Sequence, residues 1–400
     1  MDFRDSPAEA EFRAEVRQWL SEHLPEGWPD SHPIVRDSDE MVELRRWWQR
    51  QLYDAGWLGL TWPKEYGGRA EAHPGAPGSG GALAQQAIFD QEVARAQAPD
   101  PINMIGLYMA GPTIIAWGTD EQKRRYLPPL LRGDEIWCQG FSEPSAGSDL
   151  GALHTKAVRD VDGYVVNGQK VWTSYGHLAE FCLLLARTDA GAPKHKGLTY
   201  LIAGMRDPGV TVRPLAQITG DLEFNEIFFD DARVPVENRL GPEGDGWKVA
   251  MTTLLHERGT MGAAMQIGAR ITLDRLIELV RELDRADDPM VRERLASFHL
   301  DIEALRIANL RSLSKLQRGA PGPEGSMAKL LWERAQQAMG EFAMELLGSA
   351  GQVMSGPGTA GDGFWQRVYL RGRGHTIEAG TTEILKNIIA ERVLGLPRSR

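Results

Sequence analysis

The spacing of apolar residues changes twice along this chain, and this limits the possible folds more than any other feature. Apolar positions recur at helical spacing over 7–24, 41–55, 83–97 and 102–117. From 136 to 240, short runs rich in β-branched and aromatic residues replace them, separated by turns of Gly, Pro, Asn and Asp. Helical spacing then returns. The order is therefore helical, β, helical.

This order predicts an α+β multi-domain fold. We expect an N-terminal α-helical domain over 1–135, a middle antiparallel β-barrel or sandwich domain over 136–241, and a C-terminal four-helix bundle over 242–400. Four hundred residues are enough to give such domains their own cores. The bundle helices should cover 245–284, 288–317, 326–347 and 381–394, with a Gly/Pro break at 319–325 and an irregular, functional or subunit-facing stretch at 351–374.

Short strands should build the middle domain. Asn167-Gly168 has the composition of a tight hairpin turn, so we expect the chain to reverse there. The expected strands are 164–166, 170–172, 181–186, 198–203, 210–213 and 226–229.

Composition excludes several classes of protein. The net charge of -10, from 45 basic and 55 acidic residues, argues against a nucleic-acid binder. No window is apolar for long enough to span a bilayer, and the N-terminus lacks a signal-type apolar core, so we expect a cytoplasmic protein. Cys138 and Cys182 are the only cysteines and should be reduced buried thiols. No cysteine or histidine spacing indicates a metal site.

Two neighbouring motifs carry most of the candidate chemistry. Asp120 is expected to cap a helix that ends at Gly133, and the run from Ser142 to Asp149 then forms a tight turn of glycine, hydroxyls and an acid. Such a turn can hold a phosphate, a carbonyl oxygen or the edge of a heterocycle. Further on, the ring of Trp172 lies beside two hydroxyls, which suits a planar cofactor. The alternative is a core tryptophan followed by a capping serine.

Together these motifs resemble the acyl-CoA dehydrogenase family. GTDEQKRRYLPPLLRGD, SEPSAGSD and GQKVWTS match that family in order and spacing, and GTTEILKNIIAERVLGLP resembles its terminal helix. The resemblance covers nearly the whole chain and implies a C-terminal bundle that builds a tetramer core. It also implies FAD as cofactor and an acyl-CoA substrate. In such a reaction a carboxylate removes the α-proton, the flavin accepts the β-hydride, and hydrogen-bond donors polarise the thioester carbonyl.

The resemblance assigns roles residue by residue. Ser142 and Ser174 correspond to hydroxyls that bond the flavin ring, and Trp172 to the ring packed against it. Ser148 falls where the family contacts acyl-CoA. The remaining cofactor positions are Gln139 and Phe141, which offer backbone donors, and Gly380, Thr381 and Glu383, near the adenosine half.

The catalytic base departs from the best-known pattern. Many relatives place a glutamate directly before the Gly-Thr element, where this chain has Ala379; Glu378 is one residue earlier. A second branch of the family keeps its base on the first helix of the C-terminal domain, followed by arginine, and here Glu257 and Arg258 match that pair. The flanking residues are mostly apolar, so a charge there is costly. A solvated ion pair on a helix is the alternative, and Glu378 is the other candidate base.

The cofactor contacts depart as well. Relatives often carry Arg-x-x-Phe-Gly in a turn that reaches a neighbouring subunit's FAD, and this chain has ADDPMVRERLA there. Arg292 or Arg294 could replace that cation, because guanidinium suits pyrophosphate, or both could be exposed helix charges. Glu345 stands where some relatives have glutamine.

Three functions are compatible with these observations. The first is an FAD-dependent acyl-CoA dehydrogenase that passes electrons to an electron-transfer flavoprotein, as a homotetramer or as a heterotetramer with a homologous subunit. The second is a partner-dependent or non-catalytic subunit of a heteromeric dehydrogenase. The third is a flavin oxidase or monooxygenase on the same fold. Acyl length and shape, and CoA against carrier-protein thioesters, stay open.

Overall fold

The computed structural model describes residues 4–28, 38–70, 80–317, 324–356 and 359–397. The chain divides into two compact units. The first consists of Met1–Glu26, Gly75–Ala98 and Arg258–Arg400, and the second of Gly27–Pro74 and Pro99–Glu257. The division falls inside the long helix α6 (Gly246–Glu282).

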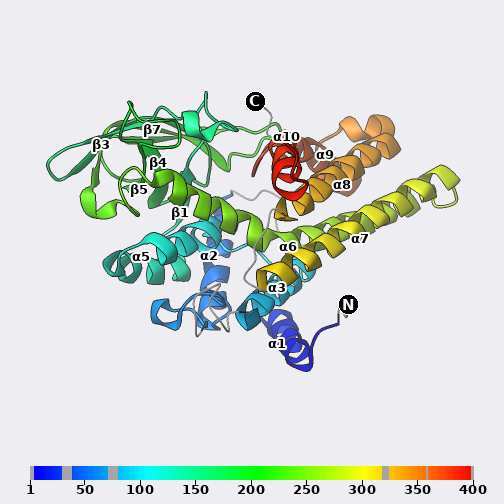
Figure 1. The fold of residues 1–400 in the computed structure, drawn as a ribbon. Helices are drawn as coiled ribbons and strands as arrows, with labels where there is room; N and C mark the ends of the chain where they lie inside the picture. Colours follow the sequence, from blue (N-terminus) through cyan, green and yellow to red (C-terminus); the bar gives the residue numbers. More distant parts are fainter. Residues whose placement is uncertain (1–3, 29–37, 71–79, 318–323, 357–358, 398–400) are drawn as a thin grey trace. The chain divides into compact units, whose positions relative to one another are not determined.

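The second unit contains a seven-stranded sheet, which lies above α2 (Asp39–Asp54) and α5 (Asp120–Arg132) in the view of Figure 1. Its spatial order is β1-β4-β2-β3-β7-β6, and β5 pairs with β4. The buried cluster beneath it includes Tyr164, Cys182, Leu201 and Ile227. The strands are β1 (Trp137–Gly140), β2 (Lys156–Arg159), β3 (Gly163–Ser174), β4 (Phe181–Arg187), β5 (Leu198–Gly204), β6 (Val210–Leu215) and β7 (Phe224–Pro235). The helical, β, helical order is therefore confirmed.

The predicted hairpin at Asn167-Gly168 is wrong. β3 continues through this pair, and both halves of the strand are antiparallel to β7, with a bulge between Val166 and Gly168. The Asn167 side chain stabilises the bulge, because its amide group exchanges two hydrogen bonds with Asp231 on β7, of 2.9 and 3.0 Å. β1 and β2, of four residues each, were not predicted.

The helices of the second unit, besides the start of α6, are α2, α4 (Gly111–Trp117) with the preceding π-turn η2 (Gly106–Ala110), and α5. Buried amides join α2 and α5 to the sheet. Gln49 donates to the carbonyls of Leu130 and Leu131 at the end of α5, and its own carbonyl accepts from Asn103 N–H at 2.9 Å. The Asn103 amide accepts from Trp137 N–H on β1 at 2.8 Å. These contacts satisfy the last carbonyls of α5, as a buried helix end requires.

Thr119, and not the predicted Asp120, caps α5. Its hydroxyl accepts from Gln122 N–H, and the Gln122 side chain accepts from Thr119 N–H, which is a capping box. The predicted end is confirmed, because Gly133 has the left-handed conformation that closes the helix.

Helices build the first unit. They are α1 (Pro7–His23), α3 (Gly80–Arg95), the later part of α6, α7 (Pro289–Gln317), α8 (Glu324–Leu347), α9 (Phe364–His375) and α10 (Thr382–Ile388). α9 corrects the irregular stretch predicted over 351–374. It packs in the core through Trp365 and Val368, an apolar spacing that two later glycines had obscured. Most of the break predicted at 319–325 lies outside the described residues.

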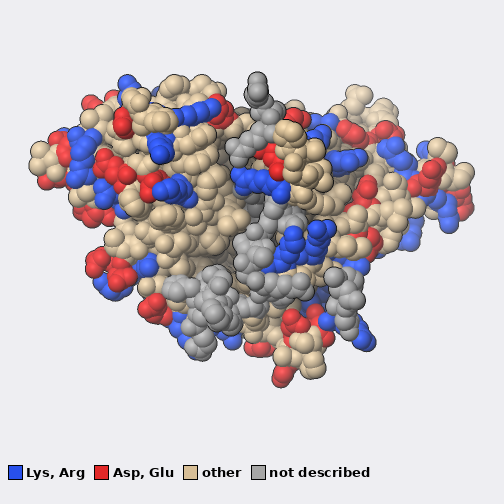
Figure 2. Space-filling model, viewed as in Figure 1, with Lys and Arg blue, Asp and Glu red and all other residues tan. Residues whose placement is uncertain are grey.

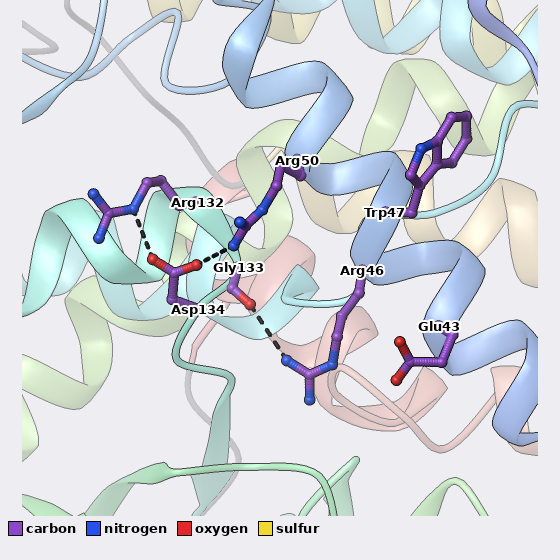
Figure 3. Close-up of a pocket in the computed structure, with 7 residues that line it drawn as sticks. All are labelled: Glu43, Arg46, Trp47, Arg50, Arg132, Gly133 and Asp134. Atoms are coloured by element: carbon purple, nitrogen blue, oxygen red, sulfur yellow. Dashed lines mark hydrogen bonds and ion pairs between the residues drawn. The ribbon is translucent and has the colours of Figure 1, made fainter.

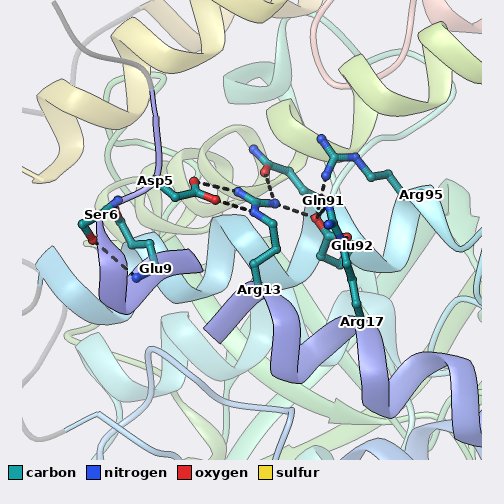
Figure 4. Close-up of polar contacts among 8 residues, drawn as sticks. All are labelled: Asp5, Ser6, Glu9, Arg13, Arg17, Gln91, Glu92 and Arg95. Atoms are coloured by element: carbon teal, nitrogen blue, oxygen red, sulfur yellow. Dashed lines mark hydrogen bonds and ion pairs between the residues drawn. The ribbon is translucent and has the colours of Figure 1, made fainter. Parts of the chain in front are cut away.

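One buried carboxylate joins α1 to α3 (Figure 4). Glu92 accepts hydrogen bonds from Arg13 and Arg17 on α1, both at 2.6 Å, and from Arg95 at 2.7 Å. Burial acts to raise the pKa of Glu92, but the arginines outweigh it and the net shift is downward. The contact is therefore charge-assisted and holds the two helices together.

The surface charge and the two cysteines agree with the expectations from the sequence. Basic and acidic side chains alternate over the face shown in Figure 2, without a large patch of one sign. Cys138 and Cys182 are buried free thiols on adjacent strands, as predicted. Among the described residues, no helix is both long and apolar enough to cross a membrane.

Candidate functional site

The two sequence motifs meet in the second unit. The segment after β1 runs beside β3, where Val171 N–H donates to the Ser142 carbonyl at 2.9 Å and Lys170 Nζ donates to the Phe141 carbonyl at 3.0 Å. Ser142 and Trp172, far apart in the sequence, therefore stand on neighbouring backbone segments. The fold brings these candidate cofactor residues together.

A buried ion pair lies behind them. Lys170 is 0% exposed and Glu143 5%, and Lys170 Nζ lies 2.9 Å from Glu143 Oε1. Glu143 also accepts from the N–H groups of His154 and Thr155, at 2.6 and 2.8 Å. Burial acts to raise the pKa of Glu143, but Lys170 and the N–H donors lower it overall. Burial also lowers the pKa of Lys170. We did not predict this pair, although both residues lie inside the motifs.

Trp172 is not a core residue. Its side chain is 57% exposed, its backbone is left-handed (φ 60°), and its ring meets Phe224 edge to face at 5.8 Å. The hydroxyls of Ser142 and Ser174 are half-buried and form no hydrogen bond with any residue that the structure describes. An accessible flat ring and two uncommitted hydroxyls on neighbouring backbone segments suit the face and edge of a flavin. These residues fit the cofactor that the family resemblance implies.

The other residues around the turn have defined places. Gln139 is half-buried on β1, and Phe141 is buried with its ring perpendicular to that of Tyr200, 5.8 Å away. Reciprocal backbone bonds of 3.0 Å between Glu143 and Ala146 close the turn. Ser148 lies exposed just after it. The position of Ser148 is compatible with a ligand contact, and its role stays a prediction.

The predicted base lies where the two units divide. Glu257 is the last residue of the second unit and Arg258 the first of the C-terminal segment, both within α6. Their side chains lie outside the described part of the structure, so the assignment of Glu257 stays a prediction.

Glu378, the other candidate base, is held in an ion-pair cluster of the first unit. It accepts from Arg371 at 2.5 Å and forms a 2.7 Å contact with His375 Nδ1. Burial acts to raise the pKa of Glu378, but His375 and Arg371 lower it to about 2. A carboxylate with so low a pKa is a weak proton acceptor. Ala379, which follows it, is left-handed (φ 51°) and has no ionisable side chain.

The Gly380-Thr381 element is fastened to α8. The buried Lys329 donates to the carbonyls of His375 and Gly380, at 2.6 and 3.2 Å, and pairs with Glu333. Thr381 caps α10 by accepting from Ile384 N–H. Glu383 is exposed in the first turn of that helix. The element therefore presents its backbone and the start of a helix from a fixed support.

The two candidate arginines differ in their surroundings. Arg294 lies over the rings of Phe298 and Phe342, at 5.8 and 5.2 Å, and lines a hollow of about 290 Å³ with Glu345. Arg292 is exposed, and no described residue bonds its side chain. Arg292 is thus the freer of the two cations.

A larger hollow, of about 390 Å³, lies between α2 and α5 (Figure 3). Arg50 and Arg132 both pair with Asp134 there, and Arg46 contacts the Gly133 carbonyl at 3.5 Å. None of the predicted site residues lines it. Asp134 thus neutralises part of the charge of the arginines in this hollow.

Family models match almost the entire chain. The models described as acyl-CoA dehydrogenase N-terminal, middle and C-terminal domains match residues 6–134, 138–232 and 244–394.

Similar proteins of known name and structure extend over the same length. The chain is 45% identical to acyl-CoA dehydrogenase IpdE1 of Mycobacterium tuberculosis, over 97% of this chain and 98% of that protein. Among solved structures it resembles the steroid ACAD Tcur3481-Tcur3483 (TM-score 0.86, 31% identity, all of both chains). It also resembles the ChsE4-ChsE5 complex of M. tuberculosis (TM-score 0.83, 33% identity, all of both chains).

Proposed function

The chain belongs to the acyl-CoA dehydrogenase family and is an oxidoreductase of that class; from this premise we propose that it works as one subunit of a heteromeric, FAD-dependent dehydrogenase for ring-bearing acyl-CoA thioesters. Two similar structures, each matched over the whole chain, carry paired names, and one is called a steroid enzyme. This supports a partner subunit and a bulky substrate in preference to a self-sufficient enzyme for straight chains.

The observation that carries the proposal is the residue found at the position where many relatives have their catalytic glutamate. Ala379 occupies it, and the neighbouring Glu378 is committed to Arg371 and His375. A short side chain at this position also leaves more room for a wide acyl group than a glutamate would. The base must therefore come from elsewhere, and we assign it to Glu257 on α6.

The chain's own residues then have the following roles. Ser142, Ser174 and Trp172 would hold a flavin ring, and Gly380 and Thr381 the adenosine half of a bound FAD. Bound FAD would supply the acceptor for the β-hydride. Glu257 would remove the α-proton of the thioester. Ser148 would contact the acyl-CoA.

The departures on the cofactor side also support a partner. The turn before α7 lacks the aromatic and glycine that relatives use, and Arg292 in the first turn of α7 is exposed. A homologous subunit with a complete turn would supply what is missing. We propose an electron-transfer flavoprotein as the acceptor of the electrons.

The test is to purify the chain alone and together with homologous chains from the same organism, and to record the visible spectrum of each. We expect a stable flavin band only in a mixed complex, bleached anaerobically by ring-bearing acyl-CoA thioesters. A chain that holds FAD alone and is bleached by straight-chain thioesters would overturn the heteromeric proposal. Rapid oxygen uptake during turnover would show an oxidase instead.

A further inference from the structure

β3 contains one residue more than β7 just before its end. The register pairs Lys170 with Ile227 and then Thr173 with Asn225, so three steps on β3 match two on β7. This is a second β-bulge, and it contains Trp172 in the left-handed conformation (φ 60°). The bulge turns the Trp172 ring outward, while Thr173 returns to the interior.

The segment after the bulge folds back over β7. Tyr175 is also left-handed (φ 53°), and its N–H donates to the Glu223 carbonyl at 2.7 Å. At Gly176 an added Cβ would lie 3.1 Å from Asn225 Oδ1, tighter than an ordinary contact. Left-handed non-glycine residues persist only where neighbouring contacts enforce them. Contacts with neighbouring residues must therefore hold the segment after the bulge in this conformation.

Asn225 supplies that contact. It is 0% exposed, and its Oδ1 accepts from both His177 N–H, at 2.9 Å, and His177 Nδ1, at 3.0 Å. Arg206 contributes from the other side by donating to the His177 carbonyl at 3.1 Å. Asn225 lies opposite Thr173 in the pairing of β7 with β3, and its Oδ1 binds His177. Asn225 therefore links the two ends of the loop that runs from Thr173 to His177.

We propose that Asn225 is a positioning residue that sets the outward pose of Trp172 by anchoring His177. This rests on the proposed function, because the pose matters through the contact between Trp172 and the flavin. The buried Asn225 Nδ2 and Thr173 Oγ1 have no partner in the described structure, so the amide is retained for the acceptor role of its oxygen.

The experiment compares Asn225→Leu, which removes the acceptor, with Asn225→Asp, which keeps it, in the assembled complex. Asn167→Leu is the matched control, since it makes the same change at the other bulge of the same two strands. We measure the FAD dissociation constant by quenching of flavin fluorescence, and the visible spectrum of bound flavin. Asn225→Leu should bind FAD roughly tenfold more weakly with a shifted flavin band. Asn225→Asp and Asn167→Leu should bind as wild type.

A double substitution separates positioning from general destabilisation. If Asn225 acts through Trp172, Trp172→Phe should weaken binding in the wild type and add little in the Asn225→Leu background. If the losses of FAD affinity from the two substitutions add up, or if Asn225→Leu binds FAD as the wild type does, the inference about Asn225 is wrong. The proposed function would not be affected. Absence of FAD from every wild-type assembly would overturn the proposed function too. If Asn225→Leu does not fold, His177→Ala is measured in its place. His177→Ala should weaken FAD binding to the same extent, and unchanged FAD binding would contradict the inference.

Discussion

Lys170 and Glu143 form an ion pair, 2.9 Å long and almost completely buried. The pair joins the turn that contains Ser142 and Glu143 to the strand that contains Lys170 and Trp172. Because Lys170 also donates to the Phe141 carbonyl, it fixes the backbone next to Ser142, and its own strand continues directly to Trp172. The residues proposed to hold the flavin thus depend on an ion pair that is almost completely buried.

Removing one member of this pair should be costly. Lys170→Met leaves the Glu143 carboxylate buried without its cation, and we expect a loss of about 3 kcal/mol in stability or more. Thermal unfolding of the chain should show it as a lower melting temperature. The double variant Lys170→Met with Glu143→Leu should recover part of the loss; equal loss in both would show that the pair itself is not the cause.

The acid side of the stability profile should depend on Glu378. Its pKa is about 2 in the folded chain, below the usual value near 4.3, so its ionised form stabilises the fold. This contribution is complete above the unfolded pKa and is lost as the pH falls towards 2. The gap in melting temperature between wild type and Glu378→Gln should therefore be widest near pH 7 and narrow below about pH 4.5. A gap that widens on acidification would contradict this.

The assignment of the base gives opposite results for two similar substitutions. Glu257→Gln should slow anaerobic flavin reduction by a ring-bearing acyl-CoA at least about a hundredfold, because no group then accepts the α-proton. FAD content should not change. In Glu378→Gln the acyl-CoA should reduce the flavin at nearly the wild-type rate, because Glu378 is already paired with Arg371 and His375. The reverse outcome would move the base to Glu378.

Periodicity was enough to predict the long elements of this fold, but not its local exceptions. Asn167-Gly168 has the composition of a hairpin, yet Asp231 on the neighbouring strand holds it as a bulge, which only the sheet can reveal. The turn and strand motifs led to Ser142 and Trp172 because their residue types are unusual. Glu143 and Asn225 were missed because a buried polar residue looks like a surface residue until its partners are known.

Substitutions of the two arginines at the start of α7 should have different effects on stability and on FAD affinity. Arg294 lies over Phe298 and Phe342, so Arg294→Ala should cost about 0.5 to 1 kcal/mol in stability and leave FAD affinity unchanged. Arg292 bonds no described residue through its side chain, so Arg292→Ala should leave the melting temperature unchanged. If its guanidinium meets the cofactor's pyrophosphate in the complex, that variant should bind FAD roughly tenfold more weakly, and less so at high salt. Unchanged affinity would leave Arg292 as a solvated helix charge.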